Sequence, residues 1–247
     1  MEPHERIIFA LDVPSFRKAE IFAETLVGKV GMFKIGLELF IATGPAIFDV
    51  VAPTPVMLDL KLHDIPETVE RAILRAGEHG VKFVTIHTQQ RETLVRAKAA
   101  AEKNEIQLLA VTVLTSMIET DLKDLLLPDG TYSSYSDSLN CFDPKRRALA
   151  LAKFASSCGI NGFVCSPQEV QTLRGALRTA TFVVPGIRPV GSEEGDQKRT
   201  GTPAQAVKDG ADYLVVGRPI RDAENPVAAA QAIAAEIATL DAARSTT

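Results

Sequence analysis

Short apolar runs recur along the chain, and longer amphipathic or alanine-rich stretches separate them. The apolar runs predict β-strands, because branched and aromatic side chains gather in them between polar turns. They cover residues 7–13, 32–39, 56–63, 83–88, 107–114, 162–166, 182–187 and 213–216. The separating stretches predict helices, the clearest of them at 15–27, 65–78, 92–103, 144–157 and 226–240. Strand and helix patterns therefore alternate along the sequence.

Eight such alternations in 247 residues predict an α/β protein built as a single (β/α)8 TIM barrel, which typically takes about 250 residues. The alternative, a doubly wound parallel sheet, usually has a glycine-rich turn after its first strand. Here the first strand runs into Asp12-Val13-Pro14-Ser15, which contains no glycine. We therefore expect one barrel domain over residues 1–247.

Polar residues stand at the carboxyl ends of nearly all the predicted strands. They are Asp12, Lys34, Asp59 with Lys61, His87, Thr115, Ser166, Arg188 and Arg218. In barrels of this kind the carboxyl ends of the strands converge on one mouth, where the chemistry is carried out. The pattern predicts one functional site at that mouth.

The segment from residue 57 to 68 is the most informative part of the chain. Leucines at alternate positions give its strand an apolar face, while Asp59, Lys61 and His63 occupy the other face. Lys34 lies on the preceding strand, and neighbouring strands are only about 5 Å apart, so a Lys34–Asp59–Lys61 array is expected. Ion pairs inside barrels can be purely structural, but two lysines with a carboxylate at the mouth favour a catalytic role.

Asp64 falls on the opposite parity from Lys61 and so lies outside that strand face. With Glu67 three residues later, it resembles a capping arrangement at the start of a helix. Asp64 and Thr68 would then share one face of the helix. The pattern does not say what this face meets.

For three further polar residues, the sequence allows either a role in the site or a purely structural role. Asp12 is either a site acceptor or a turn residue before Pro14, and its strand-end position favours the site. His63 and His87 could belong to the site or serve only in packing.

The last two strands are followed by segments suited to a phosphate. Val-Gly-Arg-Pro-Ile at 216–220 would let a backbone N–H at Gly217 approach an anion, with charge from Arg218. Arg188 follows the seventh strand and opens a polar segment, 188–202, that contains Gln197 and predicts a lid. Barrels often bind phosphate with these two loops. One phosphate monoester is the predicted handle.

Composition narrows the range of partners. Hydrophobic residues make up 46% and charged residues 23%, as in soluble globular proteins, and a net charge of -4 argues against a nucleic-acid partner. The sequence shows neither a membrane-spanning run nor the apolar core of a signal peptide, so we expect no membrane association. Its three cysteines form no CxxC pair, which favours reduced thiols in a cytoplasmic protein, and its four histidines lack metal-ligand spacing.

These motifs resemble those of the orotidine 5′-phosphate decarboxylase family, through most of the chain. The matching segments are Phe-Ala-Leu-Asp (9–12), Phe-Lys-Ile-Gly (33–36), Asp-Leu-Lys-Leu-His-Asp-Ile-Pro-Glu-Thr (59–68), Val-Thr-Val-Leu-Thr-Ser (111–116), Val-Pro-Gly-Ile-Arg (184–188), Gly-Asp-Gln-Lys-Arg (195–199) and Val-Gly-Arg-Pro-Ile (216–220). The 59–68 motif is highly specific, whereas the last is shared with many phosphate-binding barrels. The resemblance implies decarboxylation of orotidine 5′-monophosphate (OMP) to UMP in pyrimidine biosynthesis, with neither cofactor nor metal.

The resemblance also implies a role for each matching residue. Lys61 would donate the proton to C6, and Asp59 would face the carboxylate of the substrate. Lys34 and Asp12 would contact the ribose. Asp64 and Thr68 would reach into the site of a neighbouring subunit, where Asp64 would complete a catalytic Lys34/Asp59/Lys61/Asp64 charge array, and this implies a homodimer. Thr115, or Ser116 beside it, would contact the pyrimidine; Gln197 would bridge base and phosphate; and Arg188, Gly217 and Arg218 would hold the phosphate.

One segment departs from the family pattern, and two rival functions stay open. Residues 126–143 are longer than the resemblance leads us to expect, and predict a surface insertion. One rival is a Mg²⁺-dependent sugar-phosphate decarboxylase or aldolase of the same superfamily, which shares an Asp-x-Lys-x-x-Asp pattern. The other is a phosphate-binding barrel without catalytic activity. The continuation His63-Asp64-Ile65-Pro66 and Gln197 favour the nucleotide enzyme over the first rival, and the costly charge cluster argues against the second.

Overall fold

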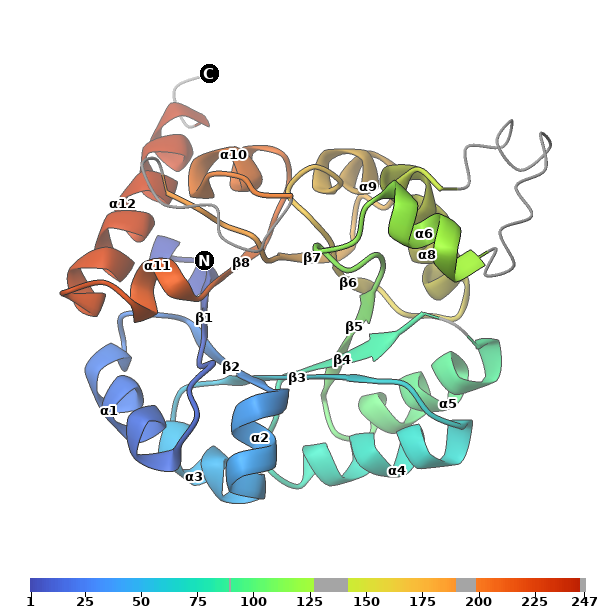
Figure 1. The fold of residues 1–247 in the computed structure, drawn as a ribbon, viewed down its shortest axis with the longest axis horizontal. Coiled ribbons are helices and arrows are strands. Elements are labelled where there is room, and N and C mark those ends of the chain that lie inside the picture. Colours follow the sequence, from blue (N-terminus) through green and yellow to red (C-terminus); the bar gives the residue numbers. More distant parts are fainter. Residues whose placement is uncertain (89, 127–141, 190–198, 245–247) are drawn as a thin grey trace.

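The computed structural model of the chain describes all residues except 89, 127–141, 190–198 and 245–247. Eight parallel strands form a closed barrel at its centre, and helices surround the barrel (Figure 1). The strands are β1 (Ile7–Ala10), β2 (Met32–Gly36), β3 (Val56–Leu62), β4 (Phe83–His87), β5 (Gln107–Val111), β6 (Gly162–Val164), β7 (Thr181–Val184) and β8 (Tyr213–Val216). Strands that follow one another in the chain are neighbours, and β8 pairs with β1 to close the ring. The predicted (β/α)8 TIM barrel is confirmed.

The helices lie between the strands, mostly one long helix for each crossover. They are α1 (Phe16–Leu26), α2 (Leu37–Thr43), α3 (Ile47–Val51), α4 (Pro66–Gly77), α5 (Arg91–Glu102), α6 (Glu119–Leu126), α8 (Pro144–Ser157), α9 (Val170–Ala176), α10 (Pro203–Lys208), α11 (Arg218–Arg221) and α12 (Pro226–Arg244). Two short 3-10 helices, η1 (Pro3–Arg6) and η2 (Gly44–Ala46), complete the described elements. None of the helices in the described ranges has the length and hydropathy needed to span a membrane.

Side chains of alternating parity divide the core into two parts. On β1, Ile8 and Ala10 point into the barrel, while Ile7 and Phe9 pack outward against the helices. The barrel interior is filled by Ile8, Ala10, Met32, Met57, Phe83, Leu109, Val183 and Val215. On β2 and β3 the next inward positions after Met32 and Met57 are Lys34 and Asp59, so the charged groups lie directly above an apolar layer.

The second strand is shorter than its apolar pattern predicts. It ends at Gly36, and Leu37 begins a helix in which Leu39 is buried while Leu37 is about half exposed. Gly36 is the N-cap residue of this helix and keeps an extended conformation. An apolar run alone does not distinguish a strand from a strand followed by a helix.

The expected capping role of Asp64 and Glu67 is wrong. Helix α4 begins at Pro66 with Ile65 as its N-cap residue, and no side chain caps it. Asp64 Oδ1 accepts a hydrogen bond from the N–H of Ile65 at 2.7 Å, and Glu67 pairs with Arg71 instead of reaching back. Proline at the first helical position needs no cap for its own nitrogen, because it has no N–H.

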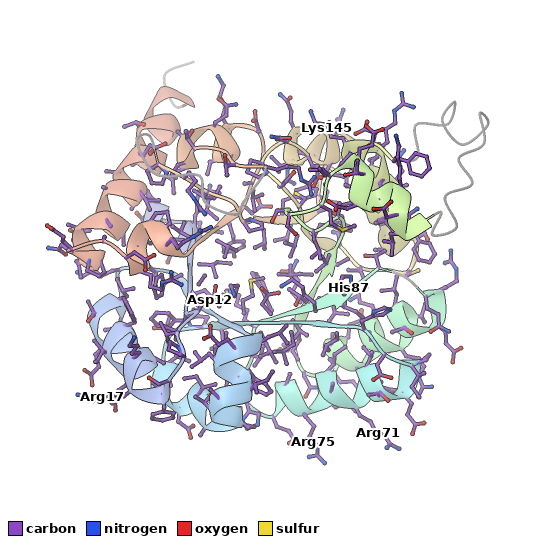
Figure 2. All side chains as sticks on the ribbon, viewed as in Figure 1. Asp12, Arg17, Arg71, Arg75, His87 and Lys145 are labelled. Carbon is purple, nitrogen blue, oxygen red and sulfur yellow. The ribbon has the colours of Figure 1, made fainter. Side chains whose placement is uncertain are left out.

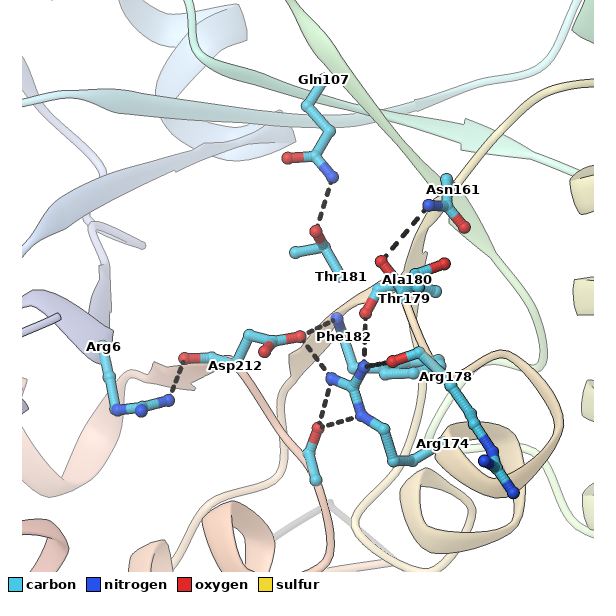
Figure 3. Close-up of polar contacts among 11 residues, drawn as sticks. Arg6, Gln107, Asn161, Arg174, Arg178, Thr179, Ala180, Thr181, Phe182 and Asp212 are labelled. Carbon is cyan, nitrogen blue, oxygen red and sulfur yellow. Dashed lines mark hydrogen bonds and ion pairs between the residues drawn. The ribbon is translucent and has the colours of Figure 1, made fainter. Parts of the chain in front are cut away.

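The amino-terminal end of the barrel is held by a different polar network (Figure 3). Arg174 of α9 donates to the carbonyl oxygens of Arg178, Ala180 and Gly210, and its Nη2 lies 2.6 Å from Oδ2 of Asp212. The same carboxylate oxygen accepts the N–H of Phe182 in β7 at 2.7 Å. This guanidinium thus joins α9 to the starts of β7 and β8, far from the predicted mouth.

Candidate active site

A cavity of about 480 Å³ opens at the carboxyl ends of the strands. It is lined by Ala10, Asp12, Lys34, Met57, Asp59, Lys61, Val111, Val113, Leu114, Thr115, Val164, Cys165, Pro185, Gly186, Arg188, Val215, Gly217, Arg218 and Arg221. Figure 2 shows Asp12 within the ring of helices, whereas Arg17, Arg71 and Arg75 project from its outer side. The prediction of one mouth that gathers strand-end polar groups is therefore largely met.

Lys34, Asp59 and Lys61 form a continuous ion-pair network on one wall of this cavity. Lys61 Nζ lies 2.9 Å from Asp59 Oδ1, and Lys34 Nζ lies 3.5 Å from Asp59 Oδ2. Lys34 Nζ also lies 2.9 Å from Oδ1 of Asp12. The register of β2 on β3, in which Gly36 pairs with Asp59, brings these groups together as the strand spacing predicts.

Burial and charge act in opposite directions on the two inner members of the network. Lys34 and Asp59 are both buried. Burial alone would lower the pKa of Lys34, but the carboxylates of Asp59 and Asp12 outweigh it, and the net result is a raised pKa. For Asp59, burial alone would raise the pKa, but the charges of Lys34 and Lys61 reverse the direction and lower it. Both groups are therefore charged at neutral pH, each held so by its partners.

Lys61 lies where β3 departs from regular strand geometry. The pairing of Leu58 with Val84 is followed by that of Leu62 with Ile86, so the register shifts within the charged segment. Lys61 has a φ of 49°, a conformation that non-glycine residues seldom adopt, and such strain clusters at functional sites. The Oγ1 of Thr85 accepts the N–H of Lys61 at 2.9 Å and donates to Asp59 Oδ1 at 3.0 Å. One buried hydroxyl thus stabilises both the irregular backbone and the carboxylate.

Gly36 leaves the space that this network occupies. A Cβ atom at this position would lie 2.9 Å from Oδ1 of Asp12 and 3.0 Å from Nζ of Lys34. Any larger residue would have to displace the ion pair. Asp12 itself accepts the ammonium of Lys34 at 2.9 Å and lines the cavity, so the site interpretation is favoured over the turn.

Cationic groups from β7 and β8 line the cavity away from this network. Arg188 follows β7, and Gly217 and Arg218 follow β8, all three among the lining residues. Arg188 N–H donates to the carbonyl of Gly201 at 2.9 Å, and Gly201 N–H donates to the carbonyl of Gly186 at 3.2 Å. These two backbone bonds hold together the described ends of the predicted lid segment, 188–202; its residues 190–198, Gln197 among them, lie outside the described part of the chain.

The loop after β5 supplies another stretch of the cavity wall. Val113, Leu114 and Thr115 line it, while Ser116 is exposed and is not among the lining residues. Of the two candidates for contact with a base, Thr115 is therefore the one that lies at the cavity wall. The predicted insertion at 126–143 lies almost wholly outside the described residues.

Asp64 and Thr68 are not part of this cavity in the single chain. Thr68 is exposed on α4, and Asp64 lines a separate cavity of about 240 Å³ together with His63 and His87. The two imidazole rings lie 5.4 Å apart between centroids. Burial, His63 and Lys61 lower the pKa of His87, in that order of size, which keeps it neutral at neutral pH. Neither histidine lines the main cavity.

Sequence reasoning missed three residues that the structure brings to the site. Thr85 is a polar residue between Val84 and Ile86 in strand β4, which was an available signal. Arg221 lines the cavity and donates to the carbonyl of Asp12 at 3.1 Å, one helical turn after Gly217. Arg199 is buried behind the wall formed by the loop after β5, and its distance along the chain from that loop left no local signal. Ser166, expected at the mouth, is fully buried instead.

Comparison with known proteins agrees with this geometry. The sequence model of the family described as "Orotidine 5'-phosphate decarboxylase / HUMPS family" matches residues 5–233. The chain is 45% identical over 239 residues to orotidine 5′-phosphate decarboxylase of Anaeromyxobacter sp. (strain K), covering 95% of this chain and 99% of that protein. It is 42% identical over 245 residues to that of Geobacter metallireducens, covering 96% and 97%.

Solved structures point the same way. The crystal structure of orotidine 5′-phosphate decarboxylase from Lactobacillus acidophilus matches with a TM-score of 0.77 and 30% identity, covering 94% of this chain and 98% of that one. An uncharacterized conserved protein from Geobacillus kaustophilus matches with a TM-score of 0.76 and 27% identity, covering 94% and 99%. Fold, site and sequence therefore agree, and the chain belongs to the orotidine 5′-phosphate decarboxylase / HUMPS family.

Proposed function

We propose that this chain decarboxylates orotidine 5′-monophosphate to UMP in pyrimidine biosynthesis, and that it does so without a cofactor. The observation that carries the proposal is the Lys34–Asp59–Lys61 network, with Lys34 and Asp59 buried, which lines the same cavity as Arg188 and Arg218. Orotidine 5′-monophosphate has a carboxylate on its base and a phosphate at the other end, so it presents a charged group to each part of this cavity. Family membership supports orotidine 5′-monophosphate as the nucleotide.

The chemistry requires a cation next to the carbon that loses carbon dioxide. Breaking the bond at C6 leaves an electron pair in the plane of the ring, where no π system can accept it. An ammonium held beside C6 stabilises that charge without moving during the reaction, and then supplies the proton. Lys61 is suited to this role, because Asp59 Oδ1 holds its Nζ at 2.9 Å and it lines the cavity.

One ammonium is not sufficient for a large rate enhancement. At about 4 Å and an effective dielectric constant near 20, a charge pair contributes about 4 kcal/mol. Binding of the remote phosphate by Arg188, Gly217, Arg218 and Gln197 would supply further energy for closing the site and excluding water. Asp59, placed against the substrate carboxylate, would repel it in the ground state. Asp12 and Lys34 would contact the ribose, and Thr115 the base.

We further propose that the active form is a homodimer in which Asp64 and Thr68 complete the partner's site. Large apolar side chains at this end of the barrel support an interface, because such exposed patches mark contact surfaces. Leu37 and Ile41 of α2 are 54% and 81% exposed, and Ile65, next to Asp64, is 64% exposed. These residues follow the neighbouring strands β2 and β3.

The decisive experiment follows the ultraviolet absorbance of orotidine 5′-monophosphate with the purified chain in EDTA. We expect turnover without metal, and we expect Lys61→Ala to abolish it while UMP still binds, because the phosphate contacts lie elsewhere in the cavity. Lys29→Ala, which removes an exposed lysine, is the matched control and should behave as wild type.

Two outcomes would contradict the proposal. Unchanged turnover in Lys61→Ala would remove that residue from the chemistry. Wild-type turnover that is absent in EDTA and restored by Mg²⁺, with an open-chain sugar phosphate as substrate, would move the chain to the metal-dependent branch.

A further inference from the structure

Arg199 is buried although it carries a charge, and it is not among the residues that line the active-site cavity. Its side chain is only 7% exposed, and its guanidinium forms an ion pair with Glu169, which is itself 1% exposed. The other carboxylate oxygen of Glu169 accepts the N–H of Ser166 at 2.9 Å. A buried pair of this kind is weak evidence for stability, because the cost of removing both charges from water offsets most of their attraction. Its presence therefore suggests another use.

The remaining donors of Arg199 converge on one short piece of backbone. They reach the carbonyl oxygens of Val113 at 3.2 Å, Leu114 at 2.7 Å and Thr115 at 3.5 Å. Strand β5 ends at Val111, so these carbonyls lie beyond the hydrogen-bond ladder of the barrel. A planar guanidinium has five donors in a fixed arrangement, which suits it to orient several carbonyls at once.

The side of this loop that faces away from Arg199 forms part of the cavity. Val113, Leu114 and Thr115 are all lining residues, whereas Arg199 and Glu169 are not. The guanidinium thus lies behind the wall and holds it against a second buried anchor, the turn before α9. The bonds that join Arg188 to Gly201 are between backbone atoms and do not involve the guanidinium.

We propose that Arg199 is a positioning residue that sets the Val113–Thr115 wall and thereby controls recognition of the base, but not of the phosphate. The inference rests on the proposed function, because it assigns this wall to the pyrimidine. Arg199 touches no substrate in this scheme. It acts through Thr115, with Glu169 as the carboxylate that orients it.

The test compares two ligands that differ in the base. UMP has base, ribose and phosphate, whereas ribose 5-phosphate has no base. Both affinities are measured by calorimetric titration for wild type, Arg199→Lys and Glu169→Gln, at a temperature where circular dichroism shows each variant to be folded. For Arg199→Lys we expect UMP affinity to fall by about tenfold or more, because a small misplacement of a contacting group can cost up to about a hundredfold.

Ribose 5-phosphate affinity should stay within about twofold of wild type in both variants, because neither substitution changes the backbone bonds among Gly186, Arg188 and Gly201 that hold the ends of the lid segment. Glu169→Gln keeps the size of the side chain. It should also weaken UMP binding more than ribose 5-phosphate binding, with a smaller loss of UMP affinity than Arg199→Lys. It also carries the test if Arg199→Lys does not fold. In turnover assays, the KM for orotidine 5′-monophosphate should rise more than kcat falls.

Arg174→Lys is the matched control. Arg174 also donates to three backbone carbonyls and pairs with one carboxylate, but at the amino-terminal end of the barrel. This substitution should lower stability and leave the ratio of the two affinities unchanged.

Equal losses for both ligands, or unchanged UMP affinity in folded Arg199→Lys, would overturn the inference and leave the proposed function intact. A wild type that binds UMP no more tightly than ribose 5-phosphate would overturn both.

Discussion

Lys61 combines an unusual backbone conformation with a place in the ion-pair network of the cavity. Its φ of 49° has an expected cost of about 1–3 kcal/mol, which the surrounding hydrogen bonds must offset. Thr85 supplies one of those bonds, and the ion pair with Asp59 holds the far end of the side chain. The ammonium lines the cavity on the same strand face as Asp59, and the irregular backbone lies within the segment where β3 and β4 change register.

The charge state of Asp59 predicts a pH dependence of stability. The pKa of Asp59 is lowered from its ordinary value of 3.8, because Lys34 and Lys61 outweigh the effect of burial. A lowered pKa in the folded state adds stability above the unfolded pKa, and this contribution is lost as the pH falls through the folded value. The difference in unfolding free energy between wild type and Asp59→Asn should therefore be largest above about pH 5 and shrink below it.

Urea titrations from neutral to acidic pH measure this difference. Glu67→Gln, which removes a carboxylate paired with Arg71 on an exposed surface, is the control and should give a small, nearly constant difference. A gap between wild type and Asp59→Asn that does not narrow in acid would contradict the assignment.

At the scale of elements, each end of the barrel has its own arginine-centred network. Arg174 joins α9 to the starts of β7 and β8 (Figure 3). Arg199 joins the loop after β5 to the turn before α9. Gly210 makes room for Arg174: a Cβ atom there would lie 2.8 Å from its Cγ, and the φ of +113° disfavours side chains. Helix α9 is thus fastened at both ends by ion pairs, a buried one at Glu169 and a partly exposed one at Arg174.

Loss of the amino-terminal network should destabilise the fold without touching the chemistry. Arg174→Ala removes the donor of the carbonyls of Ala180 and Gly210, and it removes the guanidinium that pairs with Asp212, whose Oδ2 still accepts the N–H of Phe182. Because an unsatisfied buried acceptor costs about 1–3 kcal/mol, we expect a loss of about 3 kcal/mol in unfolding free energy. Urea denaturation measures it, and kcat and KM should be unchanged under folding conditions.

Arg178→Ala is the neighbouring control, since this side chain is exposed and only its backbone carbonyl joins the network. It should change stability by no more than about 0.5 kcal/mol. A similar loss in both variants would show that the network is not what stabilises this end.

At the scale of the whole molecule, the single barrel leaves two of the expected site residues outside its cavity. Asp64 and Thr68 follow β3 on the mouth side, but Asp64 lines a different cavity and Thr68 is exposed. A second barrel that covers Ile41 and Ile65 would bury apolar surface and could bring its own Asp64 to the first cavity. The proposed dimer would thus be a condition for a complete site.

Mixing two inactive variants tests this assembly. Lys61→Ala and Asp64→Asn should each be nearly inactive, and chains that exchange at random should regain about a quarter of wild-type activity, because hybrid dimers contain one intact site. Differently tagged chains, purified in tandem, verify that hybrids form. Hybrids that stay inactive would exclude shared sites.

The sequence alone determined the order of strands and helices and the grouping of Lys34, Asp59 and Lys61, whereas Asp64, expected in the same array, lies outside this cavity. These depend on short-range periodicity: Met32 and Lys34, or Met57 and Asp59, share a strand face whatever surrounds them. The short distance between adjacent parallel strands then brings Lys34 beside Asp59. Strand ends were less certain, because an apolar run reads the same in a strand and at the start of α2.

The tertiary structure alone decided the features that join residues distant in the chain. The bend at Lys61 depends on Thr85 in the next strand, and the wall at Thr115 depends on Arg199 and Glu169. The structure also shows that Asp64 does not cap α4, which begins at Pro66 with Ile65 as its N-cap residue. Such contacts depend on how the closed barrel packs, and the local pattern of polar and apolar residues does not predict them.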